Sequence, residues 1–162
     1  MMRALLIVMI STVCVGASVA RAQESVSLPA AGSTSTWTDS KTGLMWAAKD
    51  NGGSDTTYPQ AVEYCQKLNL SGFRDWRLAK LQELRGIYDP HAASGTYLFN
   101  GNHYDLHIKG GIQLSGNGTW SSTPGNTSTE GSVFNFLIGL QYAALQDHSH
   151  SLRALCVRSA GK

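Results

Sequence analysis

The sequence predicts an α+β fold in which two early helices pack on a mainly antiparallel sheet with long irregular loops. Residues 57–70 and 81–88 carry apolar side chains at helical spacing, whereas residues 133–142 alternate as in a strand. The chain has 162 residues, of which 42% are hydrophobic and 15% charged, as in one globular domain. This excludes a large multidomain enzyme, a disordered tail and a coiled coil, and the low charge argues against a nucleic-acid partner.

Residues 1–22 have the features of a secretory signal peptide. Arg3 supplies the positive charge, residues 4–16 form a short apolar run, and Ala20-Arg21-Ala22 is a cleavage pattern before Gln23. The run is shorter than the about 20 residues that span a membrane. We therefore expect export to the periplasm or the extracellular space with no stable membrane insertion after cleavage; an uncleaved N-terminal anchor is the alternative.

Cleavage would remove the excess of positive charge. The full chain has 13 Lys and Arg against 11 Asp and Glu, and Arg3 and Arg21 lie in the leader, which leaves 11 against 11. The apparent basicity therefore belongs to the leader and indicates no phosphate or acidic partner.

Two cysteines, Cys65 and Cys156, remain in the predicted mature chain. In an exported protein, two distant cysteines are expected to form a disulfide; two buried thiols are the alternative. The bridge would close a loop of 91 positions, from 65 to 156, worth about 4–5 kcal/mol in the chain-entropy model. The chain has no C-x-x-C pair, so a catalytic thiol pair is not expected.

The first elements follow a leader that is small and polar. Residues 23–36 are expected to form a flexible linker, the domain to span 37–160, and residues 44–46 to form a short strand. Thr57 and Gln60 fit a capping box, and Pro59 suits the first turn of a helix. This helix would end near residue 70, before Ser71-Gly72, with Cys65 on its inner face.

The remaining elements are two strands and a second helix. The second helix, residues 81–88, should stop at Asp89-Pro90. Residues 91–129 are rich in Gly, Asn, Ser and His and are expected to be irregular, with Trp120 as the core anchor. Residues 133–142 and 152–158 are each predicted to form one strand, with a turn at 146–151 between them. The predicted disulfide would then staple the first helix to the last strand.

Five motifs in order resemble the Lcl C-terminal domain family of bacterial exported domains. They are the runs Thr42-Gly43-Leu44-Met45-Trp46, Ala61-x-x-Tyr64-Cys65-x-x-Leu68, Gly72-x-x-Asp75-Trp76-Arg77-Leu78 followed by Glu83-Leu84, Trp120-Ser121-Ser122-Thr123, and Cys156-Val157-Arg158. We expect these residues to be structural. The chain departs from the family pattern at Ala79-Lys80, where Pro-Thr usually starts the second helix, and it lacks the collagen-like stalk of the founding adhesins.

The resemblance implies a C-type-lectin-like fold, related also to formylglycine-generating enzymes, in which a cysteine of the first helix pairs with one of the last strand. A shared fold does not transfer function. The E-P-N, Q-P-D and W-N-D motifs that bind calcium and sugar in C-type lectins do not occur here. An oxygenase would need a cysteine pair, and both cysteines are assigned to the bridge. We expect no cofactor.

Two histidine groups are candidate zinc ligands, namely His103 and His107 with Asp105, and His148 and His150 with Asp147. Solvated turn histidines are the favoured interpretation, because H-x-x-x-H binds metal well on a helix and this region shows no helical pattern. We therefore expect no metal site.

Three other groups of residues have a chemical and a structural interpretation. Ser121 and Ser122 would be nucleophiles only beside a histidine and an acid, so a hydroxyl-bearing strand is favoured. Asp75 and Arg77 are expected to form a structural ion pair or backbone clamp. The four tryptophans are expected to fill the core, and a sugar-stacking surface is the alternative; they are Trp37, Trp46, Trp76 and Trp120.

These observations lead us to expect an exported, non-catalytic, adhesin-like binding module for a cell-surface glycan or a protein. The Lcl adhesin domains are associated with sulfated glycosaminoglycan binding and self-association, and by resemblance a sulfated ligand would need a basic patch. Its arginines would be Arg74, Arg77, Arg85, Arg153 and Arg158. One alternative is an enzyme with a pocket that holds His148, His150 or Arg153. Another is a structural envelope or appendage component that associates with itself.

Overall fold

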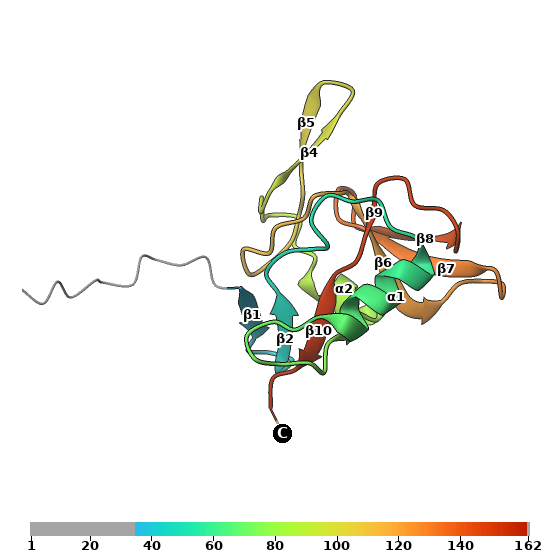
Figure 1. The fold of residues 1–162 in the computed structure, drawn as a ribbon. Coiled ribbons are helices and arrows are strands. Elements are labelled where there is room, and N and C mark those ends of the chain that lie inside the picture. The colour runs from blue at the N-terminus through green and yellow to red at the C-terminus, as the bar shows by residue number, and fades with distance from the viewer. Residues whose placement is uncertain (1–34, 162) are drawn as a thin grey trace, which may run out of the picture. The chain divides into compact units, whose positions relative to one another are not determined.

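A computed structural model describes residues 35–161 as one α+β domain (Figure 1). The predicted signal peptide and linker residues 23–34 lie outside the described residues. Thr36, the last residue of the predicted linker, opens the first strand. Within the described residues, no helix is long and apolar enough to cross a membrane.

The domain contains two four-stranded sheets, a two-stranded hairpin and two helices. The first sheet has the order β1-β2-β10-β3, the second has the order β8-β7-β6-β9, and β4 pairs with β5. Every strand pair is antiparallel except β6 with β9, which confirms the α+β class and the mainly antiparallel sheet. The bounds are β1 Thr36–Asp39, β2 Leu44–Ala47, α1 Tyr58–Lys67, β3 Arg77–Leu78, α2 Leu81–Ile87, β4 Thr96–Phe99, β5 Asn102–Asp105, β6 Gly118–Pro124, β7 Glu130–Asn135, β8 Leu140–Leu145, β9 Leu152–Arg153 and β10 Cys156–Ser159.

Helix α1 starts where the sequence predicts. The N–H of Thr57 donates to Gln60 Oε1 over 2.9 Å, which satisfies one free donor of the first turn. The helix ends at Lys67, three residues before the predicted end, because a tight turn at Ser71 and Gly72 follows. Both turn residues have positive φ, 54° and 81°, a conformation that glycine adopts without strain.

Helix α2 starts without the proline of the family pattern. Glu83 accepts a hydrogen bond from the N–H of Lys80 over 2.7 Å. Thr123 accepts one from the N–H of Leu81 over 3.0 Å. The free donors of the first turn are therefore satisfied from within the helix and from strand β6, which explains why the departure at Ala79-Lys80 is tolerated.

The predicted single strand 133–142 is wrong, since the chain reverses between β7 and β8. Gly139 has a φ of 71°, and its N–H donates to the carbonyl of Asn135 over 2.9 Å. The side chain of Asn135 also accepts from the N–H of Leu137 over 2.9 Å. Apolar residues continue through this turn, because Phe136 is buried within it, and so the alternating pattern hides the reversal.

The predicted last strand 152–158 is likewise two strands. Residues 152–153 form β9 beside β6, and residues 156–159 form β10 between β2 and β3, in the other sheet. The two residues between them are held by other partners: Asn51 Oδ1 accepts from the N–H of Ala154 over 2.8 Å, and Leu155 O accepts from the N–H of Ala79 over 3.3 Å. This segment joins the two sheets.

The region predicted to be irregular, 91–129, contains strands β4, β5 and β6 in full. The hairpin β4–β5 stands away from both sheets (Figure 1). Its two-residue turn is Asn100-Gly101, with φ of 49° and 79°, the positive values that a type I′ hairpin turn requires. Asn-Gly is a strong hairpin signal, so this element was visible in the sequence and was missed.

Two groups of buried side chains form the core. One, around Trp46, Phe134 and Phe136, lies beneath helix α2. The other, around Cys65, Trp76 and Trp120, lies beneath helix α1. Helix α1 packs against β3 of the first sheet and β6 of the second, whereas α2 packs against β6 and β7, both of the second sheet.

Candidate functional site

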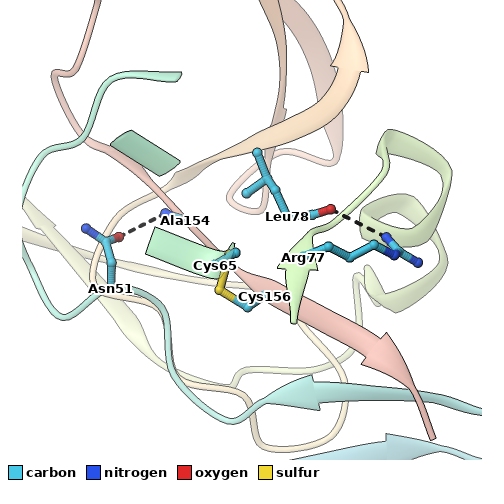
Figure 2. Close-up of a disulfide and its surroundings, with 6 residues drawn as sticks. All are labelled: Asn51, Cys65, Arg77, Leu78, Ala154 and Cys156. Carbon is cyan, nitrogen blue, oxygen red and sulfur yellow. Dashed lines mark hydrogen bonds between the residues drawn. A yellow bond between two sulfur atoms is a disulfide. The ribbon is translucent and has the colours of Figure 1, made fainter. Parts of the chain in front are cut away.

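The predicted disulfide joins helix α1 to strand β10. The sulfurs of Cys65 and Cys156 are 2.03 Å apart, with 5.4 Å between the Cα atoms, and both residues are buried. Figure 2 shows the bridge beside strand β3, with the hydrogen bond from Ala154 to Asn51 on its other side. The bridge fixes the last strand to the first helix, as the sequence predicts.

Asp75 and Arg77 belong to two different ion pairs. Asp75 accepts from Arg158 Nε over 2.7 Å and from its Nη2 over 3.1 Å. Arg77 donates to both carboxylate oxygens of Glu83, over 2.8 and 2.6 Å. The hydrogen bonds from Arg158 hold the pKa of Asp75 below its ordinary value. These motif residues connect β3 to α2 and the segment before β3 to β10.

The tryptophans do not form a sugar-binding surface. Trp46, Trp76 and Trp120 are buried, and the indole N–H of Trp120 donates to the carbonyl of Thr56 over 2.7 Å. Trp37 is half-buried and lies over Gly110, where a Cβ atom would come within 2.1 Å of its ring. All four side chains are therefore engaged in packing.

The serines of the W-S-S-T motif are also engaged within the fold. Ser121 is buried, and its Oγ accepts a hydrogen bond from the N–H of Thr123 over 3.0 Å. The N–H of Ser122 donates to the carbonyl of Ala79 over 2.8 Å. A buried hydroxyl whose oxygen already accepts a backbone hydrogen bond is poorly placed to attack a substrate.

An open cleft of about 530 Å³ lies between the β4–β5 hairpin and the second sheet. We call it the aromatic cleft. Its lining consists of Tyr97, Phe99, Tyr104, Asn117, Leu137, Tyr142, His148, His150 and Ser151.

One wall of the aromatic cleft is a single face of the hairpin. Side chains alternate across a strand, so Tyr97 and Phe99 share one face of β4. Tyr104 lies directly opposite Tyr97 in the register and therefore shares that face. The rings of Tyr97 and Phe99 are stacked, with centroids 6.1 Å apart and planes 15° from parallel. Phe99 is 45% exposed and Tyr104 39%, so these rings are open to a ligand.

The opposite wall comes from strand β8 and from the turn that follows it. Tyr142 of β8 is 43% exposed, and partial burial raises the pKa of its phenol, which keeps it a neutral hydroxyl at physiological pH. His148, His150 and Ser151 come from the turn. The hydroxyls of Tyr97 and Ser151 lie 2.8 Å apart, so a hydrogen bond joins the two walls at one end.

Arg153 lies behind the cleft and positions its wall. Its side chain is only 7% exposed, and it donates to Asp55 Oδ1 over 2.5 Å and to Ser115 Oγ over 2.9 Å. The same oxygen of Asp55 accepts from the N–H of Ser151 over 3.1 Å, and Asp55 Oδ2 lies 3.8 Å from His150 Nδ1. The hydrogen bond from Arg153 holds the pKa of Asp55 below its ordinary value. Arg153 thus anchors the turn that carries the histidines.

The other predicted histidine group is not assembled. His103 and Asp105 alternate with Tyr104 on β5 and therefore lie on the hairpin face that points away from the cleft. His107 bonds through Nδ1 to the carbonyl of Ala92 over 2.8 Å and packs edge-on against Tyr88. Within residues 35–161, no group of three or more His, Cys, Asp or Glu side chains is close enough to hold a metal ion.

The arginines named for a basic patch are largely neutralised. Arg77, Arg153 and Arg158 each contact a carboxylate, and Arg85 donates to the side-chain oxygen of Gln141. A charge that is already paired attracts a polyanion weakly.

Sequence reasoning missed the aromatic residues of the cleft. It found His148, His150 and Arg153 but not Tyr97, Phe99, Tyr104 or Tyr142, nor Asp55. The available signal was Asn100-Gly101, because a two-residue turn fixes the hairpin register and with it the face that Tyr97, Phe99 and Tyr104 share. No local pattern places Asp55 beside Arg153, since 98 positions separate them.

The comparisons with known proteins identify one family. The family model of the Lcl C-terminal domain matches residues 35–158, which is nearly the whole described chain. Comparison with curated proteins gives no significant match, and comparison with solved structures gives none either.

Proposed function

We propose, from the premise that the chain belongs to the Lcl C-terminal domain family, that it is a non-catalytic binding module whose aromatic cleft takes a cell-surface glycan. The observation that carries the proposal is the row of exposed rings on one face of the hairpin, opposite Tyr142 across the cleft. Sugar rings present faces of C–H groups that pack on aromatic rings, and their hydroxyls need polar partners at the edge.

The chemistry of the cleft lining supports a sugar of one or a few units. Aromatic and aliphatic side chains supply the contact area, and Asn117, Ser151 and the two histidines supply hydrogen bonds at one end. A highly sulfated polymer is a weaker candidate, because most of the arginines that would recognise it already have partners.

A binding role is also favoured over the enzyme alternative. The hydroxyl of Ser151 bonds to Tyr97 rather than to a base, and Ser121 is buried away from the cleft. A nucleophile needs a base within hydrogen-bond reach and a third group to orient that base. Within residues 35–161, His150 is the histidine that lies near a carboxylate; it is exposed and 3.8 Å from Asp55, which is too far for a hydrogen bond.

The test is a glycan array with matched tyrosine variants. Tyr104→Ala removes a ring from the cleft, and Tyr64→Ala removes an equally exposed ring from helix α1, outside the cleft; the two are 39% and 37% exposed. We expect the wild type and Tyr64→Ala to bind the same glycans and Tyr104→Ala to lose about tenfold or more in affinity, because a stacked ring contributes about 1 kcal/mol beyond its buried area. Equal binding by all three proteins would contradict the proposal.

A second candidate function is self-association through strand β8, which is one of the two edge strands of the second sheet in the described part of the chain. Leu140 and Leu145 on this strand are 61% and 57% exposed, and Ile138 in the preceding turn is 57% exposed. The strand has no charged residue, and charge is what usually protects a sheet edge from pairing. Sedimentation over a range of concentrations tests this, and we expect Leu140→Lys to abolish any association that the wild type shows.

We further propose that the protein is exported to the periplasm or cell surface and that its fold is C-type-lectin-like. The first proposal is supported by the leader sequence and by a disulfide of the kind found in oxidising compartments. The second is supported by a bridge that joins the first helix to the last strand. The N-terminal residue of the secreted protein tests the first, and an experimental structure superposed on C-type lectins tests the second.

A further inference from the structure

The polar end of the aromatic cleft is lined by Asn117, His148, His150 and Ser151, and its titratable side chains are the two histidines. Of the nine lining residues, none is Asp, Glu, Lys or Arg, and the two histidines are the only ones whose side-chain type changes charge between about pH 5 and 8. His148 and His150 lie with Ser151 in the same turn, and both are exposed. The charge at this end therefore depends on the protonation of two imidazoles.

The charged groups around the turn do not change the dependence of this charge on histidine protonation. Asp55 faces His150, but Arg153 neutralises Asp55 from behind over 2.5 Å. Asp147 precedes His148 in the chain, yet it lines a separate hollow with Ser128 and Thr129. The other titratable side chains that line the cleft are Tyr97, Tyr104 and Tyr142, and none of them is a carboxylate or an amine. Protonation of the histidines thus gives the polar end a net positive charge.

We infer that His148 and His150 form a subsite for a sugar unit that bears a carboxylate, and that this subsite fills at mildly acidic pH. The inference rests on the glycan-binding function proposed above. A sugar carboxylate stays ionised down to about pH 4, and imidazole is the side-chain type that gains a positive charge between about pH 5 and 8, so attraction between the two kinds of group grows in mild acid. Asn117 and Ser151 add neutral hydrogen-bond partners at the same end.

The small charge of the subsite selects the carboxylate over a sulfated polymer. At neutral pH the lining has no permanent positive charge, and in acid it gains at most two. Recognition of a polysulfated chain relies on several permanent cations, usually arginines that bind in a bidentate manner. A single weak acid on a stacked sugar ring matches a site with one aromatic wall and two imidazoles.

The experiment titrates the exported protein with a galacturonic acid trimer and with the matching neutral galactose trimer. Calorimetry is run at about pH 5.5 and about pH 7.5, on either side of ordinary histidine titration. We expect the acidic trimer to bind about three- to tenfold more tightly at the lower pH, as one or two exposed ion pairs would give. The neutral trimer should bind equally at both.

Two variants separate the histidine subsite from general effects of charge. The double variant His148→Gln, His150→Gln should lose the pH dependence for the acidic trimer, so that its affinity for that trimer is the same at both values of pH. His103→Gln, which lies on the other face of the hairpin, should behave as the wild type. Thermal unfolding of each variant shows that the domain remains folded. A pH dependence that survives the double variant overturns the inference.

The outcomes also distinguish this inference from the proposed function. If both trimers bind, and Phe99→Ala weakens both, but neither pH nor the histidines matter, then only the histidine subsite is refuted. If the trimers bind and Phe99→Ala changes nothing, then the function of the cleft itself is refuted; if neither trimer binds, the carboxylate subsite is refuted and the glycan array decides the function of the cleft. A sulfated galactose trimer that binds more tightly than the carboxylated one at both values of pH would overturn the choice of carboxylate.

Discussion

The buried scaffold around the disulfide contains the same types of aromatic and apolar residue as the aromatic cleft. The scaffold buries these residues, whereas the cleft exposes them. Trp46, Cys65, Trp120 and Val157, all from the family motifs, are fully buried. The cleft is lined by aromatic residues that are about two-fifths exposed, and none of its lining residues belongs to a family motif. The scaffold uses its apolar side chains for packing, whereas the cleft leaves them available to a ligand.

This difference indicates which part of the structure the family motifs determine. The motifs specify the disulfide, partners at the start of α2, and the ion pairs that connect β3 to α2 and the segment before β3 to β10, all of which maintain the scaffold. The cleft depends on the hairpin and on the turn after β8, which are loops and edges where sequence change costs little stability. Membership in the family therefore predicts the fold of this chain more strongly than its ligand.

Loss of the disulfide is the largest effect that separates the two regions. We expect the double variant Cys65→Ala, Cys156→Ala to lower the free energy of unfolding by about 4 kcal/mol, because the bridge closes a loop of 91 positions in the unfolded chain. Urea denaturation measures this loss. In the fraction that stays folded, glycan affinity should be unchanged, since the bridge does not line the cleft.

Serine replacements provide the control for this variant. The double variant Cys65→Ser, Cys156→Ser keeps the side-chain size and breaks the bridge, so it should lose at least as much stability as the alanine pair. A loss below about 1 kcal/mol in both would mean that the unfolded chain is already compact without the bridge. Weaker glycan binding by the folded fraction would show that the scaffold and the cleft are coupled.

Arg153 is the residue that joins the two regions, because it is buried in the scaffold yet anchors the wall of the cleft. We expect Arg153→Met to lower the free energy of unfolding by about 1–3 kcal/mol, since Asp55 and Ser115 lose hydrogen bonds to a charged group. Glycan affinity should fall as well, because Ser151 and His150 lose their anchor at Asp55.

A double-mutant cycle with Asp55→Asn checks this interpretation. If the ion pair is the cause, the two substitutions together should cost less than the sum of their separate effects. Strict additivity would mean that the loss of stability comes from the packing of the aliphatic part of the Arg153 side chain, whose Cγ lies beside Gly116.

The sequence predicted the scaffold better than the cleft for a physical reason. Helix caps such as Thr57 with Gln60, and a pair of distant cysteines in an exported chain, are signals that a few residues carry alone. Asp55 and Arg153 are 98 positions apart, and Tyr97 and Ser151 are 54 apart, so only the assembled fold brings them together. The reversal at Gly139 and the change of sheet between β9 and β10 were missed because the apolar pattern runs through both without interruption.

Acidic pH should lower the stability of both regions, because each contains an ion pair whose carboxylate becomes protonated. The pKa values of Asp55 and Asp75 are lowered in the folded state by hydrogen bonds from Arg153 and Arg158, respectively. A carboxyl with a lowered pKa contributes stability above its ordinary pKa and loses it as pH falls through the folded value. We therefore expect the free energy of unfolding to fall below about pH 4, as measured by urea denaturation across a pH series.

The variant Asp75→Asn tests the contribution of the scaffold pair to that acid loss. Its stability should be lower than that of the wild type at neutral pH, and the difference should narrow in acid. Asp105→Asn, on the outer face of the hairpin, controls for the removal of one negative charge. A difference that stays constant down to about pH 3 would contradict the role of the Asp75–Arg158 pair.

The sharpest comparison makes one substitution in each region, and the substitution in the cleft has the smallest expected effect on stability. Phe134→Ala removes a ring that is 1% exposed in the core and should cost about 3–5 kcal/mol. Phe99→Ala removes a ring that is 45% exposed in the cleft and should cost about 0.5 kcal/mol or less. Glycan affinity should show the reverse order, since Phe99 is offered to the ligand and Phe134 is not. If Phe99→Ala unfolds the domain, the hairpin is part of the scaffold, and the division between packing and recognition drawn here is wrong.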